Sequence, residues 1–181
     1  NIDTSIISIK KLDSLVKGLK RRISEGSQIY WFCPAIEFNE DTTNLTSIEE
    51  REKYLSKCFV STEFDIVHGK QKSEERDIII NNFKDGKSRI LLATTVVEVG
   101  IDVPNADIII IECSNRYGLA QLHQLRGRVG RSDKQSYCIL LYENQLSEIA
   151  EKRLNTLKST NDGFIIAEKD LILSCLLYTS P

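Results

Sequence analysis

The sequence contains no methionine, only three prolines, and no pair of cysteines at the spacing that binds zinc. Its five cysteines are widely spaced and mostly flanked by apolar residues, which predicts reduced, buried thiols and not a disulfide framework. No apolar run reaches membrane-spanning length, and nothing resembles a secretory leader. These absences exclude a zinc ribbon, a disulfide-rich secreted domain and a membrane span, and they favour a cytoplasmic protein. Because the chain begins at Asn1 and lacks methionine, we expect it to be part of a longer protein.

An excess of charge of one sign is also missing. The 24 basic and 26 acidic side chains leave a net charge of −2. A balanced chain has no global field that attracts a polyanion, so any contact with nucleic acid must come from local patches. The 181 residues suffice for one domain with a sizeable core, and the apolar content of 41% is ordinary for a globular protein.

A complete phosphate-binding P-loop is absent as well. The segment DGKS (85–88) resembles its end, but the position five residues before Gly86 holds Asn81 and not glycine. A helical pattern leads into Gly86 and a strand pattern leaves it, which is the reverse of the P-loop order. We therefore interpret this segment as a helix C-cap followed by a turn. No Asp-Glu pair follows an apolar strand, so the usual magnesium-holding acids are not found either.

What is present is an alternation of strand and helix patterns. Short apolar runs predict buried strands at 28–34, 64–69, 88–95, 106–113 and 135–143. Apolar residues at a helical period predict helices at 10–25, 47–59, 72–86 and 146–160, with further helices beginning near 119 and 162. Continuous apolar strands that alternate with helices indicate an α/β fold with a mainly parallel sheet covered on both faces.

Residues suited to end helices accompany these patterns. Ser47 and Ser73 stand where N-cap side chains are expected, and Gly26 and Gly86 stand where helices end. In such folds the functional residues gather beyond the carboxyl ends of the strands. Three polar segments fall there, and they are HGK (68–70), TTVVEVGID (94–102) and SNRYG (114–118).

The most distinctive segment is QLHQLRGRVGR (121–131), in which Gln124, Gly127, Arg128, Gly130 and Arg131 form the pattern Q-x-x-G-R-x-G-R. Two arginines three positions apart project to the same side of one helical turn, and glycines let the backbone approach closely. The planar guanidinium fork suits phosphate oxygens. The spacing alone leaves two interpretations open, a pair that meets the terminal phosphate of a nucleotide or a solvated basic helix end.

The neighbouring segments resemble those of a known family. LLATTVVEVGIDVPNADIIII (91–111) and QLHQLRGRVGR resemble motifs V and VI of superfamily 2 helicases, and QIYWFCPAIE (28–37) and VHGKQKSEERDIIINNF (67–83) resemble motifs IV and IVa. With NDGFIIAEKDL (161–171), they are similar to the second RecA-like domain of the RecG family of ATP-dependent DNA helicases, over about residues 20–171. The transcription-repair coupling factor shares the 94–131 block but fits less well at CPAIE and NDGFIIAEKDL.

The resemblance implies a RecA-like three-layer sandwich over residues 1–143 and a helical hairpin over 144–171. The sequence departs from the family at residues 172–181, where the family has a segment rich in arginine and glycine. The resemblance also implies that ATP and Mg²⁺ are held by a first motor domain that this sequence does not contain.

The resemblance implies nucleotide contacts for five residues. Arg128 and Arg131 would reach ATP across a cleft, with Arg131 as the arginine finger, and Gln124 would link the nucleotide to the moving parts of the motor. Gly100 and Asp102 would lie at the nucleotide, where Asp102 accepts from the ribose or pairs with the finger. As an alternative, Asp102 is an acid of the turn before the following proline.

The resemblance also implies a DNA-facing set and a coupling residue. Contacts to the DNA backbone are expected from His68, Gly69, Lys70, Thr94, Thr95 and Arg116. Glu98 would couple this set to the nucleotide. The alternatives are structural roles, namely strand termination for the threonines, a structural histidine at a strand end for His68 and a satisfied loop carboxylate for Glu98.

We therefore expect a monomeric motor domain of a DNA helicase that remodels branched DNA, such as replication forks and recombination junctions. Its expected partners are branched DNA and the first motor and wedge domains of the same protein, with no membrane. The domain alone is expected to be inactive. The alternatives are the motor domain of the transcription-repair coupling factor and a non-catalytic DNA-binding module on the same fold.

Overall fold

The computed structural model describes residues 2–34, 48–94, 106–130 and 133–179, with only the backbone beyond residue 173. In these ranges six strands form one sheet in the order β1-β6-β5-β2-β4-β3. The strands are β1 (Ile2–Ser8), β2 (Ile29–Cys33), β3 (Phe64–Val67), β4 (Ile90–Thr94), β5 (Ile108–Ile111) and β6 (Ser136–Tyr142). Every neighbouring pair is parallel, which confirms the predicted α/β fold and its parallel sheet.

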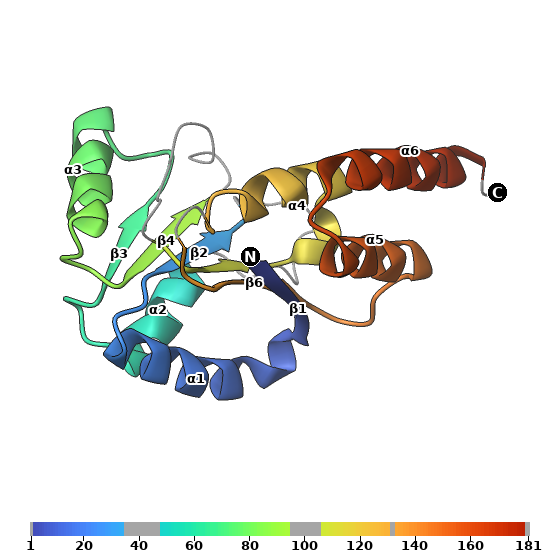
Figure 1. Ribbon diagram of the computed structural model, residues 1–181. Coiled ribbons are helices and arrows are strands. Elements are labelled where there is room, and N and C mark those ends of the chain that lie inside the picture. The colour runs from blue at the N-terminus through green and yellow to red at the C-terminus, as the bar shows by residue number, and fades with distance from the viewer. Residues whose placement is uncertain (1, 35–47, 95–105, 131–132, 180–181) are drawn as a thin grey trace.

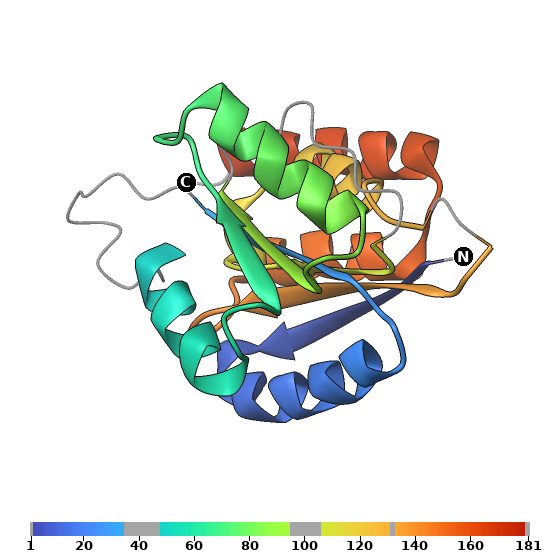
Figure 2. The same cartoon turned by 90° about the vertical axis from the view of Figure 1, so that its left-hand side faces the viewer.

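Helices cover both faces of the sheet, as Figures 1 and 2 show. One face carries the short 3₁₀ turn η1 (Ile9–Lys11), α1 (Leu12–Ser24) and α2 (Ile48–Cys58). The other face carries α3 (Ser73–Lys84), α4 (Leu119–Arg126), α5 (Glu148–Ser159) and α6 (Gly163–Thr179). The arrangement is the expected three-layer RecA-like sandwich, followed by the helix pair α5–α6. No helix in the described ranges is long and apolar enough to cross a membrane.

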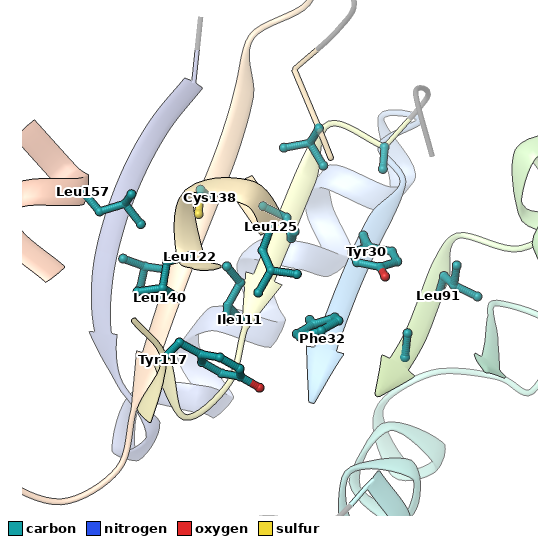
Figure 3. Close-up of a cluster of buried hydrophobic side chains, with 14 of the residues drawn as sticks. Tyr30, Phe32, Leu91, Ile111, Tyr117, Leu122, Leu125, Cys138, Leu140 and Leu157 are labelled. Carbon is teal, nitrogen blue, oxygen red and sulfur yellow. The ribbon is translucent and has the colours of Figure 1, made fainter. Parts of the chain in front are cut away.

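The strand residues divide between two cores by simple alternation. Tyr30 and Phe32 of β2 join the core beneath α3, α4, α5 and α6, whereas Trp31 between them joins the core beneath α1 and α2. Figure 3 shows the first core, where Leu122 and Leu125 of α4 lie among side chains of β5 and β6. Since both faces are covered, the central strands need apolar residues at every position, which is why they appear as continuous runs.

Two helices end as predicted, at glycines with positive φ. Gly26 (φ +100°) follows α1, and Gly86 (φ +78°) follows α3. In each case the residue after the glycine donates its N–H back to a carbonyl in the last turn, Ser27 to Arg22 at 3.0 Å and Lys87 to Asn82 at 2.9 Å. The DGKS segment is thus a helix end that leads into β4, as interpreted from the sequence.

Two expectations about the elements are wrong or incomplete. Ser73 is not the N-cap of α3, because Lys72 precedes the helix with an extended backbone and Ser73 is its first residue. The Ser73 hydroxyl instead accepts a hydrogen bond from the Arg76 guanidinium at 3.1 Å. The strand β1 was not predicted at all. The other expected cap, Ser47, lies outside the described residues.

Candidate functional site

The carboxyl ends of the parallel strands form one edge of the sheet, and the described DNA candidates lie there. His68, Gly69 and Lys70 directly follow β3, and Thr94 is the last residue of β4. Val67 pairs with Ala93, so the next positions along the two strands place His68 beside Thr94. Arg116 ends the 3₁₀ turn η4 (Ser114–Arg116) that follows β5, two strands away from β4 across β2. The structure therefore brings the histidine turn and Thr94 together and leaves Arg116 farther along the same edge.

The turn after β3 is held by specific hydrogen bonds. The Gln71 side chain accepts from the His68 N–H at 3.0 Å and donates to the Ile66 carbonyl at 3.0 Å. The Lys70 N–H donates to Nδ1 of His68 at 3.2 Å. His68 is half-buried, whereas Gly69 and Lys70 are exposed. The turn thus exposes Gly69 and Lys70 to solvent, while hydrogen bonds with the Gln71 and His68 side chains hold its backbone.

Two buried oxygen atoms at this edge have no hydrogen-bond partner among the described residues, Oγ1 of Thr94 and Oδ1 of Asn115. Thr94 is only 5% exposed. Buried polar groups are nearly always satisfied, and Thr94 directly precedes residues 95–105, which lie outside the described ranges. Asn115 precedes the exposed Arg116, so the second orphan atom also lies next to a DNA candidate.

The arginine segment lies at the opposite edge of the sheet. The helix α4 starts after η4 and runs back toward the beginning of β6, so its last residues reach the amino ends of the strands. Gly130 marks this place, because a Cβ on it would lie 2.7 Å from the Ile2 side chain and 3.6 Å from Ser136, the first residues of β1 and β6. Gln124 is exposed and Arg128 is half-buried. The rule that ligands gather at the carboxyl edge therefore does not apply to this segment.

The glycines of this segment have different structural roles. Gly130 has φ +84° and close contact with β1, so it meets the predicted need for close backbone approach. Gly127 has an ordinary helical φ of −68°, and a Cβ on it would come no nearer than 3.4 Å to another atom. The conformation of the segment therefore requires only the second of these two glycines.

The first arginine of the segment, Arg126, has a structural role that the sequence did not reveal. It is only 2% exposed, and its guanidinium donates to the carbonyls of Leu157 and, at 2.8 Å, Thr160 at the end of α5. It also donates to Thr4 of β1 at 3.3 Å. These partners are neutral, and the two carbonyls belong to the negative end of the α5 dipole, which favours a positive charge there. Burial lowers the pKa of the Arg126 guanidinium from its ordinary value.

The neighbouring His123 belongs to the same contact between helices. Its Nδ1 lies 3.4 Å from Nη2 of Arg126, and its Nε2 would lie 3.0 Å from a Cβ built on Gly163, the first residue of α6. Burial, and then the positive charge of Arg126, lowers the pKa of His123. The end of α4 is thus packed closely against the α5–α6 pair.

A second buried charge cluster supports the carboxyl edge. Glu112, 1% exposed and directly after β5, accepts hydrogen bonds from Arg51 at 2.9 Å, from the Trp31 indole at 3.0 Å and from the Cys33 thiol at 2.8 Å. Burial, with the nearby Glu112 carboxylate as the next cause, raises the pKa of Cys33 well above its ordinary value. Cys113 follows in the left-handed conformation (φ +51°) and starts the turn that carries Arg116. No sequence motif marks this cluster, and its residues were not among the predicted site residues.

Five candidates lie outside the described residues, and they are Thr95, Glu98, Gly100, Asp102 and Arg131. Their expected roles stay predictions. Among the described residues there is no group of three or more histidine, cysteine or acidic side chains that could hold a metal ion.

Comparison with known proteins identifies relatives across nearly the whole chain. Residues 9–133 match the family described as "Helicase conserved C-terminal domain". The ATP-dependent DNA helicase RecG of Synechocystis sp. is 41% identical over 172 residues, which are 95% of this chain and 21% of that protein. RecG of Escherichia coli K12 is 48% identical over 149 residues, 82% of this chain and 21% of that protein. The chain thus spans about a fifth of the length of these curated relatives.

The fold of the chain is also similar to those of solved helicase structures. A structure described as RecG bound to a three-way DNA junction superposes with a TM-score of 0.77 at 36% identity, over 94% of this chain and 22% of that one. S. cerevisiae Dbp5 bound to RNA and ADP BeF3 superposes with a TM-score of 0.59 at 21% identity, over 98% of this chain and 45% of that one, which is evidence for the fold alone. The chain belongs to the helicase conserved C-terminal domain family and is homologous to the corresponding part of the superfamily 2 helicase RecG.

Proposed function

We propose that this chain is the second motor lobe of an ATP-dependent DNA helicase that acts on branched DNA. The observation that carries the proposal is the similarity over 94% of the chain to RecG in a structure described as bound to a three-way DNA junction. On this proposal the chain supplies half of a nucleotide site and half of a DNA track. It is inactive alone, and it works as a monomer together with a first motor domain and a wedge domain.

The carboxyl edge is the proposed DNA surface. It combines an exposed cation at Lys70, an exposed cation at Arg116, and the buried Thr94 hydroxyl, which has no hydrogen-bond partner among the described residues. Cations, hydroxyl groups and backbone N–H groups contact phosphates without reading sequence. We therefore propose contacts to the DNA backbone with weak sequence preference, made by these residues and by His68, Gly69 and Thr95.

The amino edge, around the end of α4, is the proposed nucleotide surface. Arg128 and Arg131 supply permanent positive charge for phosphate oxygens, and the exposed Gln124 supplies an amide beside them. Gly100 and Asp102 complete the proposed nucleotide contacts, with Glu98 as the coupling residue. ATP bound here would supply the phosphoryl transfer, and the family places its Mg²⁺ ligands on the first motor domain. The described residues fit this division, since they offer cationic and amide donors for phosphates.

The proposal is tested by joining the chain to the first motor domain of a RecG relative and replacing Arg131 with alanine. Removal of an arginine finger lowers the rate of hydrolysis about 10³-fold or more. We expect DNA-stimulated ATP hydrolysis to fall by that amount while DNA affinity stays within twofold. R21A is a matched control, because Arg21 is exposed and its one ion pair among the described residues is with Glu25 in α1. Hydrolysis near the original rate in a folded R131A protein would refute the proposed role.

A second candidate function is a non-catalytic DNA-binding module, favoured by the absence of a P-loop from the 181 residues. The double substitution of Arg128 and Arg131 by lysine separates the two. Lysine keeps the charge but loses the planar fork. If the chain is a binding module, the doubly substituted protein keeps its DNA affinity, and fusion to the first motor domain gives no ATP hydrolysis. If the chain is a motor lobe, the fusion hydrolyses ATP and the double substitution abolishes that hydrolysis.

A further inference from the structure

The turn after β3 is organised around one side chain, Gln71. Its Oε1 accepts the His68 N–H and its Nε2 donates to the Ile66 carbonyl, each at 3.0 Å, while its own N–H donates to the His68 carbonyl at 3.3 Å. These three bonds reach the backbone on both sides of the His68 Cα. The conformation of His68 is therefore set by a residue three positions later and not by the strand alone.

The hydrogen bond at the imidazole then determines which nitrogen of His68 carries a proton. The Lys70 N–H lies 3.2 Å from Nδ1, and an amide N–H can only donate. Nδ1 is therefore the acceptor, so the proton of the neutral ring is on Nε2. The turn thus provides a neutral N–H donor at the opposite side of the ring from Nδ1.

The surroundings of this donor are those of a phosphate contact. His68 and Thr94 each follow the last paired residues of their strands, Val67 and Ala93, so both lie at the carboxyl edge of the sheet. The exposed Lys70 adds a positive charge two residues away. A ring N–H donor and a cation two residues apart can bind the oxygens of one phosphate of a nucleic-acid backbone.

We propose that Gln71 is a positioning residue for DNA binding, which fixes the turn so that the Nε2–H of His68 meets a phosphate oxygen. This inference rests on the proposed function. It makes a distinction within the turn, because His68 contributes a neutral hydrogen bond and Lys70 contributes charge. Only a contact that neutralises a phosphate changes the salt dependence of binding, by about one in the slope of log K against log salt.

The test uses the full 181-residue chain and a fluorescein-labelled 12-base-pair duplex, with affinity measured by anisotropy over a range of salt concentrations. Q71M keeps the length of the side chain but removes both side-chain hydrogen bonds. We expect Q71M and H68A each to weaken binding about fivefold to tenfold, which corresponds to the loss of about one hydrogen bond. We expect neither to change the salt slope, whereas K70A lowers it by about one. Because both act on one contact, the double substitution weakens binding no more than H68A alone.

The matched control is Q135M, because Gln135 is exposed and its Nε2 donates to the Ser136 carbonyl at 3.2 Å, at the amino edge. Q135M leaves duplex affinity unchanged. Long-range ¹H–¹⁵N spectra provide a readout that does not depend on DNA. They show the Nε2–H tautomer of His68 in the unsubstituted chain and a mixture of tautomers in Q71M.

Two results overturn the inference and are distinguishable. If the unsubstituted chain binds the duplex and folded Q71M binds it equally well, Gln71 has no positioning role, and the DNA surface stands. If neither the unsubstituted chain nor its fusion to the first motor domain binds the duplex, the proposed DNA surface is wrong, and the role of Gln71 fails with it.

Discussion

Replacement of Arg126 by methionine tests whether a buried guanidinium holds α5 in place. Methionine fills a similar length but donates no hydrogen bonds, so the carbonyls of Leu157 and Thr160 lose their partner. Hydrogen bonds to a charged group contribute about 1.5–3 kcal/mol each. Removal of the buried charge offsets part of this loss of stability, because the desolvation of Arg126 no longer opposes folding. We therefore expect R126M to lower the free energy of unfolding by about 3 kcal/mol.

Urea denaturation followed by circular dichroism measures this change, with two comparison variants. R21M is the matched control, since the Arg21 side chain is 83% exposed and, within the described residues, forms an i,i+4 pair, so its loss changes stability by less than about 0.5 kcal/mol. R126K keeps the charge but cannot span two carbonyls, so its stability falls between those of R126M and the unsubstituted chain. If R126M unfolds within 0.5 kcal/mol of R21M, on the scale of ordinary surface changes, the capping role of Arg126 is refuted.

Three further predictions concern stability. G130A forces a left-handed backbone on a residue with a Cβ and creates a close contact, so we expect the free energy of unfolding to fall by about 2–4 kcal/mol. G127A is expected to be neutral or slightly stabilising. Equal effects of the two substitutions in thermal unfolding would contradict this prediction. E112Q leaves the buried Arg51 without its counter-charge, and a loss of about 3–5 kcal/mol is expected in urea, with less than 1 kcal/mol as the opposing result. Because burial lowers the pKa of His123, the folded state disfavours protonation of this side chain. The stability that is present above about pH 6.5 is therefore lost as the pH falls. We expect H123Q to flatten this decline, and an unchanged dependence of stability on pH would contradict the prediction.

The central sheet could be predicted because its strands carry continuous apolar runs. The four isoleucines of β5 are the clearest case, since a strand between two neighbours and two helix layers needs apolar residues at every position. Among the described strands β1 is an edge strand next to β6, and its sequence IDTSIIS carries polar residues at four of seven positions. An edge strand of this kind resembles a loop in sequence, and its pairing depends on a partner more than 130 residues away.

Parts of the candidate site followed from the same logic. A parallel sheet puts every strand end at one edge, so the placement of His68, Thr94 and Arg116 could be predicted from the strand pattern. The roles of Arg126 and Glu112 could not. The main partners of Arg126 are backbone carbonyls 31 and 34 positions along the chain, and no side-chain pattern marks a carbonyl. The partners of Glu112 are 61, 79 and 81 positions away on other elements, and their meeting is a consequence of the fold.

The position of α4 has a consequence for how the two proposed surfaces communicate. Its eight residues span about 12 Å at 1.5 Å per residue, from the turn that carries Arg116 to the segment that carries Arg128. The buried face of the helix, formed by Leu119, Leu122 and Leu125, packs into the core at close density. A closely packed interior transmits strain, so on the proposed function we expect a displacement at the Arg116 end of α4 to be passed to its Arg128 end. Arg126 fixes the far end of the same helix to α5, and therefore any such movement must carry the α5–α6 pair with it.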